Sequence, residues 1–228
     1  MGIIISSNLS WDKHYNYIIP KSYKMLGLLR WCFSKFHSPI VKKTLYLTLV
    51  RSQITYCSAI WRPYLVKDIQ NFERIQRRAT KFILNDYDSD YYTRLMKLEL
   101  LPLMYTFDLF DIVFILKSLK YPFLSFNIKI FISFNANETR SNTYGKLTHK
   151  TSSNNIERNF FFFRIPRLWN TLPPIDLSLS VATNKVKITE FLWSHFMSHF
   201  KSDNPCTYQL VCPCSKCAYN RPSPNFNS

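Results

Sequence analysis

Glycine is scarce in this chain of 228 residues, which contains only Gly2, Gly27 and Gly145. An average composition would give roughly 16 glycines. Because the three lie far apart, no glycine-rich loop can bring several backbone N–H groups onto a phosphate. Nucleotide sites of the Rossmann and P-loop types are therefore excluded.

Long apolar runs are absent as well. No stretch approaches the roughly 18 uncharged apolar residues that a membrane-spanning helix requires, because the most apolar region is interrupted at Asp108, Asp111, Lys117 and Lys129. The start of the chain lacks the basic stretch of a secretory signal. We therefore expect no membrane partner and an intracellular location, either cytoplasmic or nuclear.

Acidic residues do not form a recognisable catalytic group. The chain has no adjacent Asp-Asp pair, and metal-assisted phosphoryl transfer requires at least two converging carboxylates. Asp86, Asp88 and Asp90 alternate in a loop that lacks the glycine and the terminal glutamate of a calcium site. Asp108 and Asp111 share one side of a helix. We expect structural roles for all five, and no Ser or Cys lies in a known nucleophile motif, so the sequence predicts no active site.

Cysteines are few and unevenly placed. Of the six, Cys32 and Cys57 lie in helical patterns and are expected to be buried thiols. The other four crowd into one short segment, an arrangement that does not fit a disulfide-stapled secreted domain. This distribution favours a reducing compartment.

The C-terminal cysteines are candidate metal ligands. Four thiolates at this density can close tetrahedrally on zinc, although the spacing between the second and third is tighter than usual. His195 and His199, at i and i+4, could replace one thiol. An HExxH protease motif is excluded because Phe196 stands where its Glu belongs. The alternative is a tail that binds no metal. The candidate zinc ligands are Cys206, Cys212, Cys214 and Cys217.

The charge balance is strongly positive, with 30 Lys and Arg against 14 Asp and Glu and a net charge of +16. A surplus of that size repels itself in a compact chain, so an acidic partner is expected, and nucleic acid is the commonest one. Residues 21–81 carry 13 of the basic residues and only two acidic ones, Asp68 and Glu73. An ordinary solvated surface carries both signs, so this part of the chain is predicted to contact phosphates.

The apolar pattern predicts a mainly α chain. Helices are expected from the turn at 10–12 to Phe36, then over 39–61, 67–84, 91–98 and 102–119, and from an N-cap at Thr183 onward. The predicted organisation is a short strand within residues 1–10, a helical bundle over 11–119, a flexible and irregular connection with short strands over 120–158, a smaller α+β segment with a final helix over 159–202, and a Cys-rich tail over 203–228.

Two of these helices define the candidate interface. The one over 39–61 is apolar nearly all round, which predicts burial apart from a narrow polar stripe at Lys42, Lys43, Tyr46 and Gln53. The one over 67–84 has one apolar stripe, running from Ile69 to Phe82, and a second stripe that is wholly basic. The predicted phosphate contacts, which would hold a backbone without reading sequence, are Lys42, Lys43, Arg74, Arg77, Arg78 and Lys81.

Five segments of the chain resemble, in the same order, motifs of one known protein family. Glu73-Arg74-Ile75-Gln76-Arg77-Arg78-Ala79-Thr80-Lys81 is similar to the "ERVQRRATK" helix of that family. Arg164-Ile165-x-Arg167-Leu168-Trp169-Asn170-x-Leu172-Pro173 resembles its "RxxxLWNSLP" element. Further similar segments are Met25-Leu26-Gly27-Leu28-Leu29-Arg30, Leu45-Tyr46-x-Thr48-Leu49-Val50-Arg51-Ser52 and Tyr56-Cys57-Ser58-x-Ile60-Trp61. Together these motifs resemble the region after the polymerase palm in non-LTR (LINE-type) retrotransposon reverse transcriptases.

The resemblance implies a helical thumb and a C-terminal segment, which in such enzymes clamp template and primer. It implies that residues 1–10 correspond to the exit strand of the palm. The catalytic carboxylates and their Mg²⁺ belong to a palm upstream of the matching region, so no residue here inherits a catalytic role, and a separate palm is an expected partner. The alternatives are an independent, domesticated nucleic-acid-binding protein with a structural zinc tail, and an inactive gene product without a stable fold.

Overall fold

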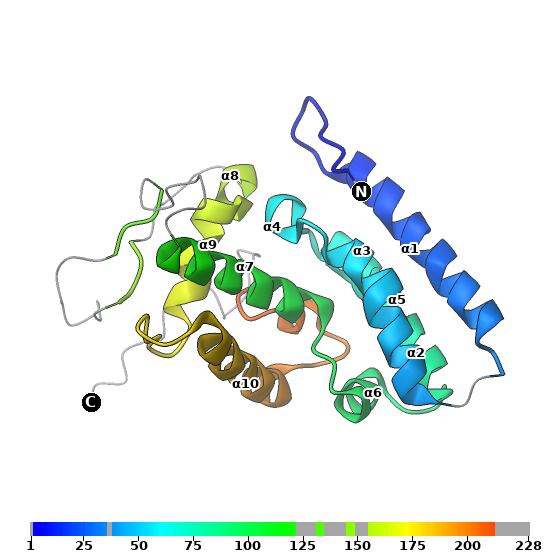
Figure 1. Cartoon of the computed structure of the whole chain (residues 1–228). Helices are drawn as coiled ribbons and strands as arrows, with labels where there is room; N and C mark the ends of the chain where they lie inside the picture. Colours follow the sequence, from blue (N-terminus) through cyan, green and yellow to red (C-terminus); the bar gives the residue numbers. More distant parts are fainter. Residues whose placement is uncertain (1, 36–37, 122–130, 135–144, 149–154, 213–228) are drawn as a thin grey trace. The chain divides into compact units, whose positions relative to one another are not determined.

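The computed structural model describes residues 2–35, 38–121, 131–134, 145–148 and 155–212. The chain forms two compact units, which are described separately. The first contains Met1–Met104 and Phe200–Tyr208, and the second contains Tyr105–His199 and Gln209–Ser228. The described residues are mainly helical (Figure 1), which confirms the expected α-rich fold.

Helices make up nearly all of the first unit. The boundary between the units falls in the first turn of α7, within the range that the sequence pattern assigns to one bundle. The elements of the first unit are α1 (Asp12–Cys32), α2 (Pro39–Leu45), the π-helix η1 (Tyr46–Arg51), α3 (Ser52–Thr55), α4 (Ser58–Trp61), α5 (Val66–Leu84), α6 (Tyr91–Leu98) and the 3-10 helix η3 (Pro205–Tyr208).

The core of the first unit lies between α1 and α5. The apolar stripe of α5 is buried, as predicted, and its Phe72 ring lies 5.3 Å from that of Tyr15 and 5.4 Å from that of Trp61. The Tyr15 hydroxyl donates a hydrogen bond to the Trp61 carbonyl at 2.9 Å. Further along both helices, Arg78 contacts Tyr23. Contacts therefore advance along α1 and α5 together, which means that the two helices run in the same direction.

The helix expected over 39–61 is not continuous. It begins at Pro39 as predicted, changes to π-helical turns over Tyr46–Arg51, and stops after Thr55. Cys57 has a φ of 52°, in the left-handed region, which a right-handed helix cannot contain. A short helix, α4, resumes beyond it. The expectation of one uninterrupted helix was therefore wrong.

The orientation of this segment also differs from the prediction. Lys42, Tyr46 and Gln53, expected to face solvent, are buried, whereas Ile40 and Leu49 are exposed. Each of the three buried side chains donates at least one hydrogen bond: Lys42 to the Phe82 carbonyl at 3.4 Å, Tyr46 to Gln76 Oε1 at 3.0 Å and Gln53 to the Leu49 carbonyl at 2.6 Å. A π-helical turn holds an extra residue, so it rotates the side chains that follow it relative to an α-helix.

The second unit is built from α7 (Leu103–Lys120), α8 (Asn155–Asn159), α9 (Phe161–Asn170) and α10 (Val181–His199). In the Phe-rich run at 159–164, Asn159 ends α8, Phe160 is the N-cap of α9, and Phe161 to Arg164 are helical. The run was too short for its periodicity to decide between strand and helix. The start of α10 is capped by Ser180, whose hydroxyl accepts from the Thr183 backbone N–H at 3.0 Å. Thr183 was therefore wrongly predicted as the cap.

Regular strands are absent from the part of the chain that the structure describes. The strand expected at Ile3 to Ile5 does not form, since residues 2–6 belong to no helix or strand. The second unit was expected to contain short strands. Its described residues contain only one isolated β-bridge, between Phe134 and Leu147. A strand requires a hydrogen-bonded neighbour, and residues 2–6 have none in a regular ladder.

Candidate nucleic-acid interface

Helix α5 presents a face with one sign of charge. Arg74 and Arg78 are exposed and Lys81 is half-buried, and their spacing of i, i+4 and i+7 places them on one side of the helix. The two acidic residues of α5, Asp68 and Glu73, are both buried. The outward face of α5 is therefore positive without any compensating carboxylate.

The same charge separation extends beyond α5. From residue 13 to residue 85, Asp68 and Glu73 are the only acidic residues. Because both are buried, no carboxylate in the described part of this segment is exposed. A positive potential over such a surface attracts polyanions. The exposed basic residues of the segment are Lys13, Lys24, Arg30, Lys35, Lys67, Arg74 and Arg78.

Aromatic rings fix two of the α5 cations. The Arg78 guanidinium lies 4.9 Å from the centroid of the Tyr23 ring on α1. The Lys81 ammonium lies 6.0 Å from the centroid of the Tyr87 ring. Stacking on a ring restricts the side chain but leaves N–H donors available, since a guanidinium has five. Arg78 thus joins the basic surfaces of α1 and α5.

Lys42 does not belong to this surface. Its side chain is buried, and its ammonium lies 4.7 Å from the Phe82 ring centroid and 3.4 Å from the Phe82 carbonyl oxygen, to which it donates. A buried ammonium holding a backbone carbonyl is not placed to reach a phosphate. We therefore remove Lys42 from the predicted contacts. Lys43, its neighbour, is half-buried and stays a candidate.

Arg77 is also not placed to contact a phosphate, because other residues of the first unit bind its guanidinium. Its guanidinium donates to the Ser202 carbonyl at 2.6 Å and to the Tyr208 hydroxyl, and it lies 4.5 Å from the centroid of the Tyr91 ring. These contacts attach the segment 200–208 to the side of α5. The basic stripe predicted from the sequence thus divides into an outward part, Arg74, Arg78 and Lys81, and an inward residue, Arg77.

A buried polar network lies on the inward side of α5, around Glu73 and Gln76. Glu73 accepts hydrogen bonds from the Tyr91 hydroxyl and, at 3.0 Å, from the Leu103 backbone N–H. Gln76 donates to the Tyr91 hydroxyl at 3.2 Å and to the Leu101 carbonyl at 3.0 Å. Burial raises the pKa of Glu73 to about 7, against the opposing effect of these hydrogen bonds. Sequence reasoning missed this network, although Glu73 and Gln76 lie at i and i+3 beside the apolar stripe.

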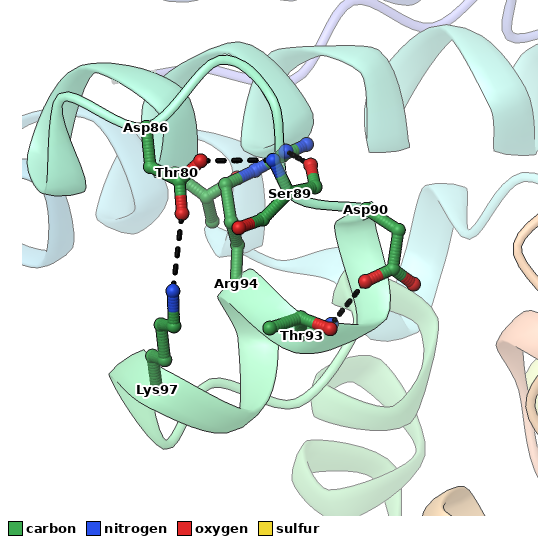
Figure 2. Close-up of polar contacts among 7 residues, drawn as sticks. All are labelled: Thr80, Asp86, Ser89, Asp90, Thr93, Arg94 and Lys97. Atoms are coloured by element: carbon green, nitrogen blue, oxygen red, sulfur yellow. Dashed lines mark hydrogen bonds and ion pairs between the residues drawn. The ribbon is translucent and has the colours of Figure 1, made fainter.

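Two of the three acidic residues in the loop after α5, Asp86 and Asp90, have structural roles (Figure 2). The Asp86 carboxylate forms an ion pair with Lys97 at 3.2 Å and accepts from the Ser89 backbone N–H at 2.9 Å. Hydrogen bonds from Ser89 and Lys97 lower the pKa of Asp86. The Asp90 side chain accepts from the Thr93 backbone N–H at 3.1 Å and so caps α6.

Arg94 holds this loop against α5 by hydrogen bonds from its guanidinium (Figure 2). Its side chain is buried, and its guanidinium donates to the Ser89 carbonyl and, through Nε at 3.3 Å, to the Thr80 hydroxyl on α5. The loop is thereby tied to α5 beside the exposed cations. These residues position the interface and are not expected to contact a ligand themselves.

The remaining acidic pair has a structural role in the second unit. Asp111 forms an ion pair with Arg164 at 2.9 Å, and Asp108 accepts from the Leu210 backbone N–H at 2.9 Å. Both carboxylates are buried. Among the residues that the structure describes, no group of three or more His, Cys, Asp or Glu is placed to hold a metal ion.

The candidate zinc ligands are only partly described. Cys206 is half-buried in η3 of the first unit, and Cys212 is buried in the second unit. Cys214 and Cys217 lie outside the described residues, so a zinc site in the tail stays a prediction. The rings of His195 and His199 are stacked 4.2 Å apart, and the Tyr105 hydroxyl lies 2.9 Å from His195 Nδ1.

Cys32 and Cys57, which the sequence pattern predicted to be buried thiols, are exposed.

Comparison with protein-family models, curated proteins and solved structures gives no match for this chain. The resemblance to reverse transcriptases therefore depends on the sequence motifs alone, and its consequences are proposals. Within the described residues, no helix has both the length and the apolar character needed to cross a membrane.

Proposed function

We propose that the first unit binds nucleic acid by its sugar–phosphate backbone, through the outward face of α5 and the adjoining basic surface of α1. The observation that carries this proposal is the burial of Asp68 and Glu73, which leaves the exposed charge of residues 13–85 entirely positive in the described structure. Such a surface neutralises phosphates and releases their counterions.

The spacing of the α5 cations suits a backbone. At a rise of 1.5 Å per residue, Arg74 and Lys81 lie about 10 Å apart along the helix axis. One strand of a duplex carries a phosphate roughly every 3.4 Å along its axis, so the three cations span about three phosphates. Contacts of this kind fix position and orientation but carry no sequence information. Binding is therefore expected to be independent of sequence.

We further propose that the chain is the thumb and C-terminal part of a retrotransposon reverse transcriptase, holding template and primer for a palm that supplies the catalytic carboxylates and Mg²⁺. The ordered motifs support this proposal, and the mainly helical fold agrees with it. The chain itself is then not an enzyme. Purified protein should incorporate no nucleotide on a primed template with Mg²⁺ or Mn²⁺, and measurable incorporation would contradict the proposal.

Fluorescence anisotropy with a labelled RNA–DNA hybrid tests the binding. We expect a dissociation constant in the micromolar range that weakens steeply between 50 and 200 mM salt, since each phosphate contact adds about 0.9 to the slope of log affinity against log salt. A triple variant, R74E/R78E/K81E, should bind at least tenfold more weakly and show a shallower slope.

The matched control places the same charge change in the second unit. Lys117, Lys185 and Lys187 are exposed there, and the K117E/K185E/K187E variant alters net charge by the same amount. It should bind within about threefold of the wild type. Equal losses in both triple variants would show that affinity follows net charge, and the α5 interface would then be wrong.

A further inference from the structure

The outward face of α1 carries exposed apolar side chains that the packing of the first unit does not explain. Trp31, in the last turn of α1, is 80% exposed, the highest value among the large apolar side chains of the described residues. Leu28 and Tyr17 are also exposed on this helix. The core-facing residues of α1, such as Leu26 and Leu29, are almost fully buried, so the helix has a distinct second apolar surface.

Basic residues surround this surface. Lys24, Arg30 and Lys35 are exposed close to Trp31 in the sequence, and Lys21 lies 5.2 Å from the Tyr17 ring centroid. No acidic residue occurs between residues 13 and 67. A hydrophobic contact with a neutral partner would not need so many cations. The combination of an exposed indole and unopposed positive charge therefore suits an anionic ligand that also offers flat apolar rings.

We propose that the outward face of α1, with Trp31 at its end, is a stacking site for the bases of single-stranded nucleic acid. Base–aromatic stacking tolerates any sequence because every base has a π-face, and a basic groove or surface holds the backbone alongside it. This proposal rests on the proposed function and adds the class of substrate. In a duplex the base faces are covered by neighbouring pairs, so Trp31 should distinguish single strands from duplexes.

The position of the site extends the α5 surface. Arg78 lies against Tyr23 of α1, and Trp31 follows Tyr23 by eight residues, or about 12 Å of helix. A single strand continuing from a duplex held by Arg74, Arg78 and Lys81 would meet Trp31 along α1. The arrangement fits a template or a displaced strand next to a duplex.

The test measures the affinity of the full chain for a labelled oligothymidine and for the RNA–DNA hybrid in parallel. W31A should weaken binding of the oligothymidine about tenfold and change binding of the hybrid by less than twofold, while W31F, which keeps a ring, should retain most of the affinity. I40A is the matched control, because Ile40 is an exposed apolar residue without a ring that lies on α2, outside the proposed site. It should bind both nucleic acids within about twofold of the wild type. Trp31 is exposed, so none of these changes should impair folding.

Each outcome decides between the proposals. If W31A binds the oligothymidine as tightly as the wild type while both bind the hybrid, the stacking site is wrong and the α5 interface stands. If wild-type protein binds neither nucleic acid, both proposals fail. If W31A loses binding to anionic phosphatidylserine vesicles and keeps its affinity for the oligothymidine, the surface is a membrane contact and the stacking proposal is overturned. Quenching of tryptophan fluorescence by oligothymidine should also be strongly reduced in W31F.

Discussion

The side chains of Arg77 and Tyr208 are hydrogen-bonded across 131 residues of sequence. The guanidinium also donates to the Ser202 carbonyl at 2.6 Å and lies over the Tyr91 ring. Arg77 therefore connects α5, α6 and the segment 200–208 of the first unit. Its neighbour Arg78 is exposed, and its guanidinium lies over the Tyr23 ring on α1. Two adjacent arginines thus have different expected roles, which mutation can separate.

Replacing Arg77 by alanine should destabilise the protein, whereas replacing Arg78 should weaken binding. R77A removes charged hydrogen bonds to Ser202 and Tyr208, so the free energy of unfolding should fall by about 2 kcal/mol. R78A removes only an exposed cation–π contact with Tyr23, so its free energy of unfolding should fall by about 0.5–1 kcal/mol. Urea denaturation and anisotropy with the RNA–DNA hybrid measure the two effects. An R77A protein of unchanged stability that no longer binds the hybrid would show that Arg77 is a phosphate ligand.

The buried carboxyl of Glu73 should make stability depend on pH. Its pKa is raised from 4.5 to about 7 by burial, so between these values the folded chain holds a proton that the unfolded chain has released. The free energy of unfolding should therefore fall as pH rises from about 4.5 to 7 and level off above that. The size of the change is on the order of 1–3 kcal/mol.

The variant E73Q isolates this contribution. Subtracting its unfolding free energy from that of the wild type at pH 5 and pH 8 should give a difference that varies with pH in the stated direction. D88N, which alters an exposed acid of the nearby loop, should leave the wild-type pH dependence intact. Parallel pH profiles for E73Q and the wild type would mean that Glu73 stays ionised in the fold.

The periodicity of α5 was enough to predict its bounds to within one residue and its apolar stripe, because both follow from residues within one helix. Ile69, Phe72 and Ile75 are buried as expected. The different roles of Arg77 and Arg78 could not be predicted in the same way, since they depend on Tyr208 and Tyr23, which are distant in sequence. Local pattern shows that a face is basic, but long-range packing determines which cations remain accessible.

The prediction of which side of the segment 39–61 is buried was wrong for a different reason. The sequence is apolar nearly all round, so the period alone does not decide which side is buried. The structure buries Tyr46 and Gln53 because α5 and the helical backbone supply hydrogen-bond partners: Gln76 Oε1 for Tyr46, and the Leu49 carbonyl, at 2.6 Å, for Gln53. The π-helical turns then bring Leu49 to the surface. Neither the partners nor the change of helical pitch has a recognisable local signal.

The cap of α6 provides a local test of the loop beside the interface. Asp90 accepts the Thr93 backbone N–H at 3.1 Å, so D90A should lower the free energy of unfolding by about 1 kcal/mol. D88A changes an exposed aspartate two residues earlier, for which we expect less than about 0.5 kcal/mol. Thermal and urea unfolding of both variants measure the difference. Equal stabilities for D90A and D88A would show that the cap contributes nothing.

The ion pair of Arg164 and Asp111 should be the most sensitive site of the second unit. The Asp111 side chain is fully buried and the Arg164 side chain is 10% exposed, with 2.9 Å between Arg164 Nε and Asp111 Oδ2. R164M keeps most of the side-chain volume but leaves a buried carboxylate without its cation, so a loss of about 3–5 kcal/mol is expected. K185M, at an exposed lysine of α10, should have almost no effect.

The double variant R164M/D111L distinguishes the loss of a pair from the loss of a charge. With both charges replaced by apolar side chains, no uncompensated carboxylate remains, and buried pairs exchanged in this way are often neutral or stabilising. The double variant should therefore be more stable than R164M alone in urea denaturation. If it is less stable than R164M, Asp111 contributes through hydrogen bonds that an apolar side chain cannot replace, and the stability of this unit depends on its buried polar groups more than on the ion pair.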